Sequence, residues 1–196
     1  VVFESMFGNT EQVARAVAEG LRSEGVSTQV VDVSAAPTEL PPSVDLLVVG
    51  APTHAFSLSR LTTRIEAVSR GADPAKTAVG LREWLERARP RTDQPLHVAV
   101  YDTRVSKVRR LPAAAGPSAA RLARRRRFAS VERPVAFLVA DIKGPLIEGE
   151  LARAGSWGRS LVALTRPAAR RPVGVAAGTD PGTDPGVVGV RIPTSD

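Results

Sequence analysis

Short, continuously apolar segments alternate with helical patterns along this chain, and this alternation most limits the folds it can adopt. Residues 45–50 and 96–101 are apolar without the period-two pattern of a half-exposed strand, as is typical of strands covered on both faces. Between such segments, apolar residues recur at intervals of three and four, which predicts helices. The sequence therefore predicts an α/β fold with a parallel sheet and helices on both of its faces.

Five strands and about five helices are expected within residues 1–164, which we interpret as one domain. The expected strands cover residues 1–4, 26–33, 45–50, 96–101 and 128–140, the last interrupted at Pro134. The expected helices are a first one that follows residue 10 and ends by Gly25, and then 59–69, 77–88, 117–126 and 148–164. Residues 165–196 are rich in Pro and Gly and poor in apolar residues, which predicts a flexible tail.

The loop of residues 5–10, Ser-Met-Phe-Gly-Asn-Thr, lies between the first strand and the first helix. A helix N-terminus carries unpaired N–H groups and a partial positive charge, so it attracts phosphate. Ser5, Asn9 and Thr10 add side-chain donors, and Gly8 permits backbone conformations that other residues resist. The loop lacks both the lysine of triphosphate-binding loops and the G-x-G-x-x-G pattern of dinucleotide-binding ones. It therefore indicates a site for a single monophosphate, although an ordinary strand-to-helix turn is the alternative.

Residues 4–11 resemble the phosphate loop of flavodoxins, whose pattern is Ser or Thr, any residue, Thr or Phe, Gly, Asn or Thr, and Thr. Residues 50–54 resemble the second flavin loop of that family, and residues 101–104 fall where its third loop leaves strand four. The similarity continues into residues 143–151, as in flavodoxin-domain proteins common in actinobacteria, and covers the chain to about residue 164. It implies a doubly wound sheet of order 2-1-3-4-5, with FMN at the carboxyl ends of strands one and three, where the winding reverses.

The resemblance assigns the cofactor-binding residues to three loops. The first loop is expected to hold the phosphate and the other two to flank the ring; the residues are Ser5, Met6, Phe7, Gly8, Asn9, Thr10, Pro52, Thr53, His54, Ala55, Phe56, Asp102, Thr103 and Arg104. Flavodoxins often stack the ring between two aromatic side chains, but here the third loop offers none after Tyr101. We interpret Tyr101 as a core residue, and Phe56 either packs or contacts the flavin. Trp84 and Trp157 are expected in core or interface packing.

The chain contains no cysteine and only two histidines, His54 and His97. Disulfides, iron–sulfur clusters, thiolate metal sites and cysteine nucleophiles are thereby excluded, and a histidine-rich metal site is not expected. Redox chemistry must come from a bound organic cofactor. No catalytic side chain is assigned, because electron and hydride transfer at a flavin require none.

Positive charge is concentrated in one segment of this chain of net charge +7. Residues 104–133 contain ten Arg or Lys residues against the single acid Glu132, which suggests an anionic partner such as nucleic acid, an acidic protein or a phosphorylated ligand. By hypothesis, Arg104 and the nearby Lys107, Arg109 and Arg110 raise the flavin's reduction potential; the alternative is that they face solvent. We interpret residues 124–127 as the solvated end of a helix, and without interleaved aromatics nucleic acid is not favoured.

No apolar run is long enough to span a membrane and no secretory signal is present, so we expect a cytoplasmic protein. Because Val1 already lies in an expected strand, a short leader is expected to precede it. The sequence predicts an FMN-binding flavodoxin-like protein that carries electrons or acts as a small oxidoreductase with a nicotinamide, a quinone or a redox partner protein. The alternative is a flavin-free flavodoxin-like module with a binding or regulatory role.

Overall fold

The computed structural model describes residues 1–90, 96–110, 113–126, 128 and 130–165. One sheet contains the strands β1 (Val2–Phe3), β2 (Val31–Asp32), β4 (Leu46–Pro52), β6 (His97–Val105), β7 (Ser130–Val131) and β8 (Val135–Val139). A second sheet is the parallel pair β3 (Glu39–Leu40) and β5 (Arg89–Pro90). The helices are α1 (Asn9–Ser23), α2 (Leu61–Ser69), α3 (Leu81–Arg87), α4 (Ala115–Arg125) and α5 (Glu150–Ser160), with 3-10 turns η1 (Pro74–Thr77), η2 (Ser106–Val108) and η3 (Leu161–Leu164).

The main sheet is parallel throughout and runs in the order β2-β1-β4-β6, after which β6 pairs with both β7 and β8. β7 pairs with the first residues of β6 and β8 with its last, so the two form one edge strand that is interrupted around Pro134. Proline lacks the N–H that a ladder needs, which explains the interruption that the sequence predicts there. With β7 and β8 counted as one strand, and with β3 and β5 of the second sheet set aside, the order is the expected 2-1-3-4-5.

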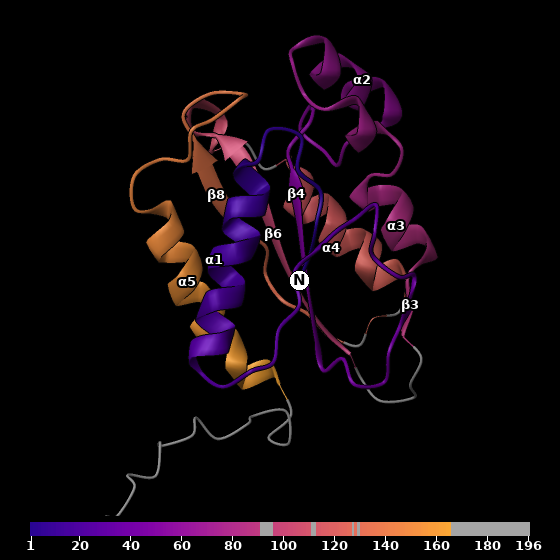
Figure 1. Cartoon of the computed structure of the whole chain (residues 1–196), viewed down its shortest axis with the longest axis vertical. Helices are drawn as coiled ribbons and strands as arrows, with labels where there is room; N and C mark the ends of the chain where they lie inside the picture. Colours follow the sequence, from indigo (N-terminus) through magenta and orange to yellow (C-terminus); the bar gives the residue numbers. More distant parts are fainter. Residues whose placement is uncertain (91–95, 111–112, 127, 129, 166–196) are drawn as a thin grey trace, which may run out of the picture.

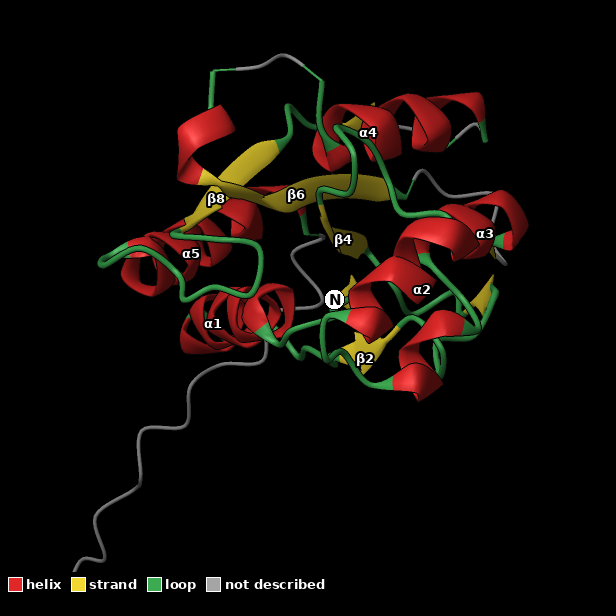
Figure 2. Cartoon of the chain, turned by 90° about the horizontal axis from the view of Figure 1, so that it is seen from above, coloured by secondary structure: helices red, strands yellow, loops and turns green. Residues whose placement is uncertain are grey.

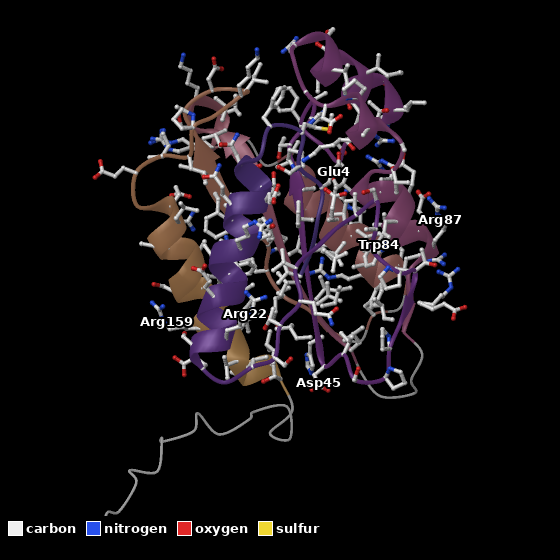
Figure 3. All side chains as sticks on the ribbon, viewed as in Figure 1. Glu4, Arg22, Asp45, Trp84, Arg87 and Arg159 are labelled. Carbon is white, nitrogen blue, oxygen red and sulfur yellow. The ribbon has the colours of Figure 1, made fainter. Side chains whose placement is uncertain are left out.

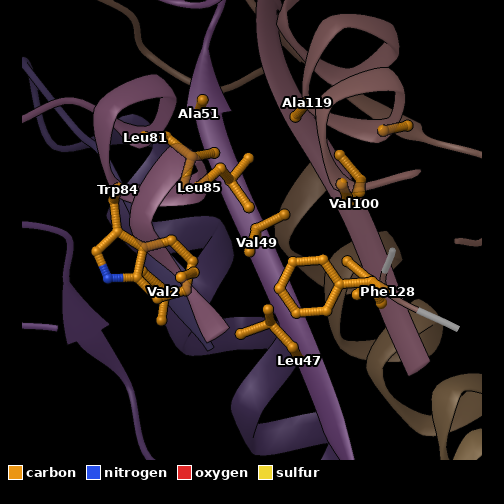
Figure 4. Close-up of a cluster of buried hydrophobic side chains, with 14 of the residues drawn as sticks. Val2, Leu47, Val49, Ala51, Leu81, Trp84, Leu85, Val100, Ala119 and Phe128 are labelled. Carbon is orange, nitrogen blue, oxygen red and sulfur yellow. The ribbon is translucent and has the colours of Figure 1, made fainter. Parts of the chain in front are cut away.

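Helices cover both faces of this sheet, as the uniformly apolar strands predict (Figures 1 and 2). On one side α3 and α4 bury Leu81, Trp84, Leu85 and a row of alanines against β4 and β6 (Figure 4). On the other, α1 and α5 enclose the second cluster, in which Tyr101, Phe137 and Trp157 meet edge to face or tilted, with ring centroids about 6 Å apart. Both tryptophans and Tyr101 therefore contribute to core packing.

Several element boundaries differ from the expected ones. The second strand pairs only over Val31–Asp32, because β1 offers it only the backbone around Val2–Phe3. The strand expected to end at residue 101 continues to Val105, so residues 102–104 belong to β6 and not to a loop. Both neighbours of β6 extend alongside these residues and pair with them, which is why the strand continues. The expected tail from residue 166 on lies outside the described residues.

Glycines allow α1 and α5 to pack with their backbones in close approach. A Cβ on Gly20 would lie 2.1 Å from the Gly155 carbonyl oxygen, and one on Gly158 would lie 2.2 Å from the Val17 carbonyl oxygen. Neither collision can be relieved by a side-chain rotation, since the obstructing atoms are backbone. By contrast, a Cβ on Gly155 would meet nothing closer than 3.7 Å.

We expect Gly20→Ala to lower the free energy of unfolding by about 1–3 kcal/mol, because the methyl group forces the two helices apart. The matched variant Gly155→Ala, in the same helix pair, should be neutral or stabilising by up to ~1 kcal/mol, since alanine favours a helix interior. Urea unfolding followed by circular dichroism measures both. Equal effects of the two substitutions would contradict this account of the α1–α5 contact.

Candidate functional site

A cavity of about 330 Å³ opens at the carboxyl ends of β1, β4 and β6. Its walls come from the β1–α1 loop, the β4–α2 loop, one face of α2, the end of β6 and the segment after β8. Figure 3 shows Glu4, which directly precedes the first of these loops, near this edge of the sheet, and Asp45 near the opposite edge. The cavity therefore lies at the carboxyl ends of the central strands, next to the point where the winding of a doubly wound sheet reverses. Such folds bind ligands at this point.

The structure brings most of the predicted site residues together around this cavity. Its lining includes Ser5, Met6, Phe7, Asn9, Thr10, Pro52, Thr53, His54, Ala55, Thr103 and Arg104. Gly8, Phe56 and Asp102 are not among the lining residues. The lining also includes residues that the sequence analysis missed, namely Thr63, Glu66, Ala67, Arg70, Val105, Val139 and Ile142. Thr63, Glu66, Ala67 and Arg70 follow the spacing of one helical face, a signal that could have revealed them.

The first loop presents hydrogen-bond donors to the cavity. Gly8 precedes α1 with φ +85°, a left-handed conformation that suits glycine. In the first turn of α1, the Glu11 N–H donates to Ser5 Oγ at 3.3 Å, whereas those of Asn9 and Thr10 have no acceptor among the described residues. Because Ser5 Oγ accepts this bond, its own hydroxyl proton can be donated to a ligand.

Hydrogen bonds across the cavity floor tie the first loop to the other two walls. The hydroxyls of Thr10 and Thr103 lie 2.8 Å apart, and Asn9 Nδ2 donates to the Lys143 carbonyl oxygen at 3.0 Å. The Tyr101 hydroxyl, fully buried, donates to the Thr10 carbonyl oxygen at 3.0 Å. Tyr101 is thus a core residue, as interpreted from the sequence, and it also fixes the start of α1.

The second loop contains a strained tight turn. His54 and Ser57 exchange two backbone hydrogen bonds at 3.0 and 2.9 Å, and between them Ala55 and Phe56 have φ of 44° and 62°. Such turns are usually made by Asn-Gly, and non-glycine residues with positive φ often occur at functional sites. Phe56 is 50% exposed, so it neither packs in the core nor lines the cavity. Burial lowers the pKa of His54, which keeps its imidazole neutral at neutral pH.

Asp102 lies within β6 and points away from the cavity toward the start of α4. Its carboxylate is fully buried, accepts the Gly116 N–H at 2.9 Å and receives two bonds from Arg104, at 2.7 and 2.5 Å. The prediction that Asp102 flanks the ring is therefore not supported, and the reason is that this residue belongs to a strand and not to a loop. The charge of Arg104 at the cavity is compensated by Asp102, while Lys107, Arg109 and Arg110 are exposed to solvent.

A buried polar network, which the sequence analysis missed, holds α2 and thereby one wall of the cavity. The Arg64 guanidinium is almost fully buried and donates to the Thr77 carbonyl, to Ser59 Oγ and to Glu83. Beside it, Glu4 Oε2 accepts the Leu81 N–H at 2.8 Å, and Oε1 has no hydrogen-bond partner among the described residues. Buried charges require such partners, so the network constrains how α2 sits.

The donor set of the cavity fits a flavin mononucleotide. One end offers the Asn9 and Thr10 N–H groups and the hydroxyls of Ser5 and the Thr10–Thr103 pair, which suit a phosphate. Elsewhere Met6, Pro52, Ala67, Val139 and Ile142 supply apolar surface for a ring system. Among the described residues no group of three His, Cys, Asp or Glu is placed to hold a metal ion, and no described helix has the length and hydropathy to cross a membrane.

Comparison with known proteins agrees with this geometry. The sequence model of the flavodoxin family matches residues 1–87. A flavodoxin from the domain Archaea is 15% identical over 83% of this chain and 94% of its own, with a TM-score of 0.53. A flavodoxin from Streptococcus pneumoniae is 18% identical over 83% and 95%, with a TM-score of 0.53, and flavodoxin 1 from Bacillus cereus is 16% identical over 83% and 95%, with a TM-score of 0.51. No curated protein matches the chain. At these identities the solved structures establish the fold.

We expect Glu4 to make the free energy of unfolding depend on pH, and Glu4→Gln to remove this dependence. Burial raises the pKa of Glu4, so the folded chain holds this proton more tightly than the unfolded chain, and stability falls as the pH rises from the ordinary carboxyl range through the folded pKa. Glu4→Gln keeps an acceptor for the Leu81 N–H without the charge. We therefore expect its unfolding free energy, relative to that of the unmodified chain, to increase across this pH range.

Urea unfolding at a series of pH values measures the difference, with Glu19→Gln on the exposed face of α1 as the control. Parallel pH curves for Glu4→Gln and the unmodified chain would show that the buried carboxyl does not titrate differently in the folded state.

Proposed function

We propose that this chain, a flavodoxin-like protein, binds FMN in the cavity at the carboxyl edge of its sheet and uses it to transfer electrons. The observation that carries the proposal is that one cavity joins two surfaces: a helix N-terminus with N–H and hydroxyl donors, and an apolar surface from Met6, Pro52, Ala67, Val139 and Ile142. A monophosphate joined to a flat ring system matches both surfaces. The flavin, when bound, supplies the one- and two-electron chemistry.

The chain's own residues would bind and orient this group. The Asn9 and Thr10 N–H groups and the Ser5 hydroxyl would hold the phosphate at the positive end of α1. His54 and Ala55 of the turn and the exposed Ile142 would contact the ring and limit its access to water. More specifically, the bound flavin would exchange electrons with a nicotinamide, a quinone or a protein partner, and no side chain would act as an acid or a base.

Charge compensation at the cavity bears on the flavin's reduction potential. A free guanidinium beside the ring would stabilise a reduced, anionic flavin. Here Arg104 is paired with the buried carboxylate of Asp102. The pair presents a dipole to the cavity, and a dipole raises the reduction potential less than an unpaired cation would. We therefore expect only a modest upward shift from this residue.

Removing one phosphate donor should weaken FMN binding but not riboflavin binding. We expect Ser5→Ala to raise the Kd for FMN roughly 10- to 100-fold, because a hydrogen bond to a charged group contributes about 1.5–3 kcal/mol. Riboflavin has the same ring without the phosphate, so its Kd should change less than about twofold. Quenching of flavin fluorescence on titration with apoprotein measures both constants, and Ser156→Ala, exposed on α5, is the matched control.

An equal loss of affinity for both ligands would contradict the assignment of Ser5 to the phosphate. A colourless protein that binds neither flavin would favour the flavin-free module. Two features of the chain are compatible with that alternative, namely the exposed Phe56 and the absence of aromatic side chains in described residues 102–110.

A further inference from the structure

The cations of segment 104–133 separate into two groups in space, although they are close in sequence. The α4 helix begins beside the cavity, where the Ala115 N–H donates to Thr53 Oγ1 at 3.1 Å. It ends near the start of β6, because Arg124 Nη2 donates to the Val131 carbonyl oxygen and Val131 pairs with Val98. The exposed Arg121, Arg124 and Arg125 therefore lie toward the edge of the sheet opposite the cavity.

The other group lies at the mouth of the cavity. Lys107, Arg109 and Arg110 follow directly after the lining residues Arg104 and Val105, and all three are exposed. The register Val105↔Val139 places this segment beside the chain that leaves β8, which adds the exposed Lys143. We call Lys107, Arg109, Arg110 and Lys143 the basic rim.

Little negative charge offsets the basic rim. In described residues 104–110 and 139–145 the one exposed acid is Asp141, whose Oδ1 accepts the Ile142 N–H. Across the cavity, Glu66 on α2 is paired with Arg70 and adds no net charge. The charge of Arg104 is neutralised by Asp102, so the excess positive charge lies on the basic rim and not inside the cavity.

An exposed apolar side chain lies next to these cations. Ile142 lines the cavity and yet is 52% exposed, and it directly precedes Lys143. A solvent-exposed apolar group at the mouth of a site, bordered by charges of one sign, matches the arrangement of a protein interface with a polar rim. Charges of one sign around such a group also steer an oppositely charged partner toward it and raise the association rate 10- to 1,000-fold.

We infer that the basic rim is the docking surface for an acidic electron-carrier protein, whose carboxylates pair with the rim and whose apolar contact covers Ile142. The inference rests on the proposed function, because the partner must come within electron-transfer distance of a bound flavin. Single-stranded nucleic acid fits less well, because described residues 104–110 and 139–145 hold no aromatic side chain for base stacking. An anionic membrane fits less well too, since Ile142 is the single large apolar side chain exposed in those segments.

Two triple variants of equal charge change test this surface. K107E/R109E/R110E reverses the rim, and R121E/R124E/R125E reverses the far group; each lowers the net charge from +7 to +1. The probes are cytochrome b5, whose surface is acidic, and cytochrome c, whose surface is basic. Each oxidised haem takes one electron from the reduced, FMN-loaded chain, and its reduction is followed by stopped-flow absorbance.

For the unmodified chain, the rate constant with cytochrome b5 should fall as ionic strength rises. At low ionic strength the rim variant should lose roughly tenfold or more of this rate constant, and the far-group variant less than about threefold. With cytochrome c the rim variant should react faster than the unmodified chain. FMN affinity, measured alongside, should be unchanged in both variants, because none of these residues lines the cavity. Circular dichroism checks that both variants are folded.

Equal losses in the two variants would overturn the inference, because they would show that total charge and not the rim governs association. Rim-dependent binding of a single-stranded oligonucleotide or of phosphatidylserine vesicles, with the cytochrome b5 rate unchanged, would overturn it as well. If the chain binds no FMN, the proposed function fails separately. Complex formation with cytochrome b5, measured by calorimetry on both variants, then still tests the rim, and its loss in the rim variant alone supports the docking surface.

Discussion

The site depends on one contact, in which Tyr101 of β6 reaches across β4 to the first turn of α1. Tyr101 and Gly50 are register partners in adjacent strands, and a Cβ on Gly50 would lie 1.9 Å from the tyrosine ring. The missing side chain leaves room for the ring, whose hydroxyl then donates to the Thr10 carbonyl oxygen. This contact links the central strands to the helix start that would hold a phosphate, so the position of that helix start follows from core packing.

Two buried charged groups near the cavity, Asp102 and Arg64, connect different parts of the fold. Asp102 joins Arg104 to the N-terminal turn of α4, and Arg64 joins α2 to Ser59, Thr77 and Glu83. Removing one partner from such a pair leaves an uncompensated buried charge, which costs far more than the pair contributes. The Asp102 and Arg64 networks both lie next to the walls of the cavity, and we infer that they hold these walls in one conformation.

Backbone strain and exposed apolar side chains both occur near the mouth of the cavity, in contrast to the dense packing below it. The turn at Ala55 and Phe56 holds two non-glycine residues at positive φ, and Phe56 and Ile142 leave large apolar surfaces exposed there. A chain optimised for stability alone would place glycine in that turn and polar residues at the rim. The combination is expected of a mouth that meets a ligand and a partner.

Much of this arrangement was decided by local sequence. The uniform apolar strands predicted a parallel sheet with two covered faces, and residues 5–10 predicted a phosphate loop because the donors and the glycine that such a loop needs are adjacent in the chain. Most residues of the first and second loops line the cavity for the same reason, since their side chains are placed by the turns that contain them.

Tertiary structure decided the rest, because it depends on which segments meet. Asp102 reads as a loop residue until two neighbouring strands pair alongside it and turn its carboxylate toward α4. The buried Arg64 network and the α2 wall join residues far apart in sequence, so no local pattern reveals them. The segment 104–133 is predominantly basic in the sequence, and only the course of α4 shows that its cations lie toward opposite ends of the sheet. The sequence by itself thus determined the donors and apolar residues that a site for a phosphate and a ring requires. The packing of the strands determined which residues line the cavity and which cations are exposed beside it.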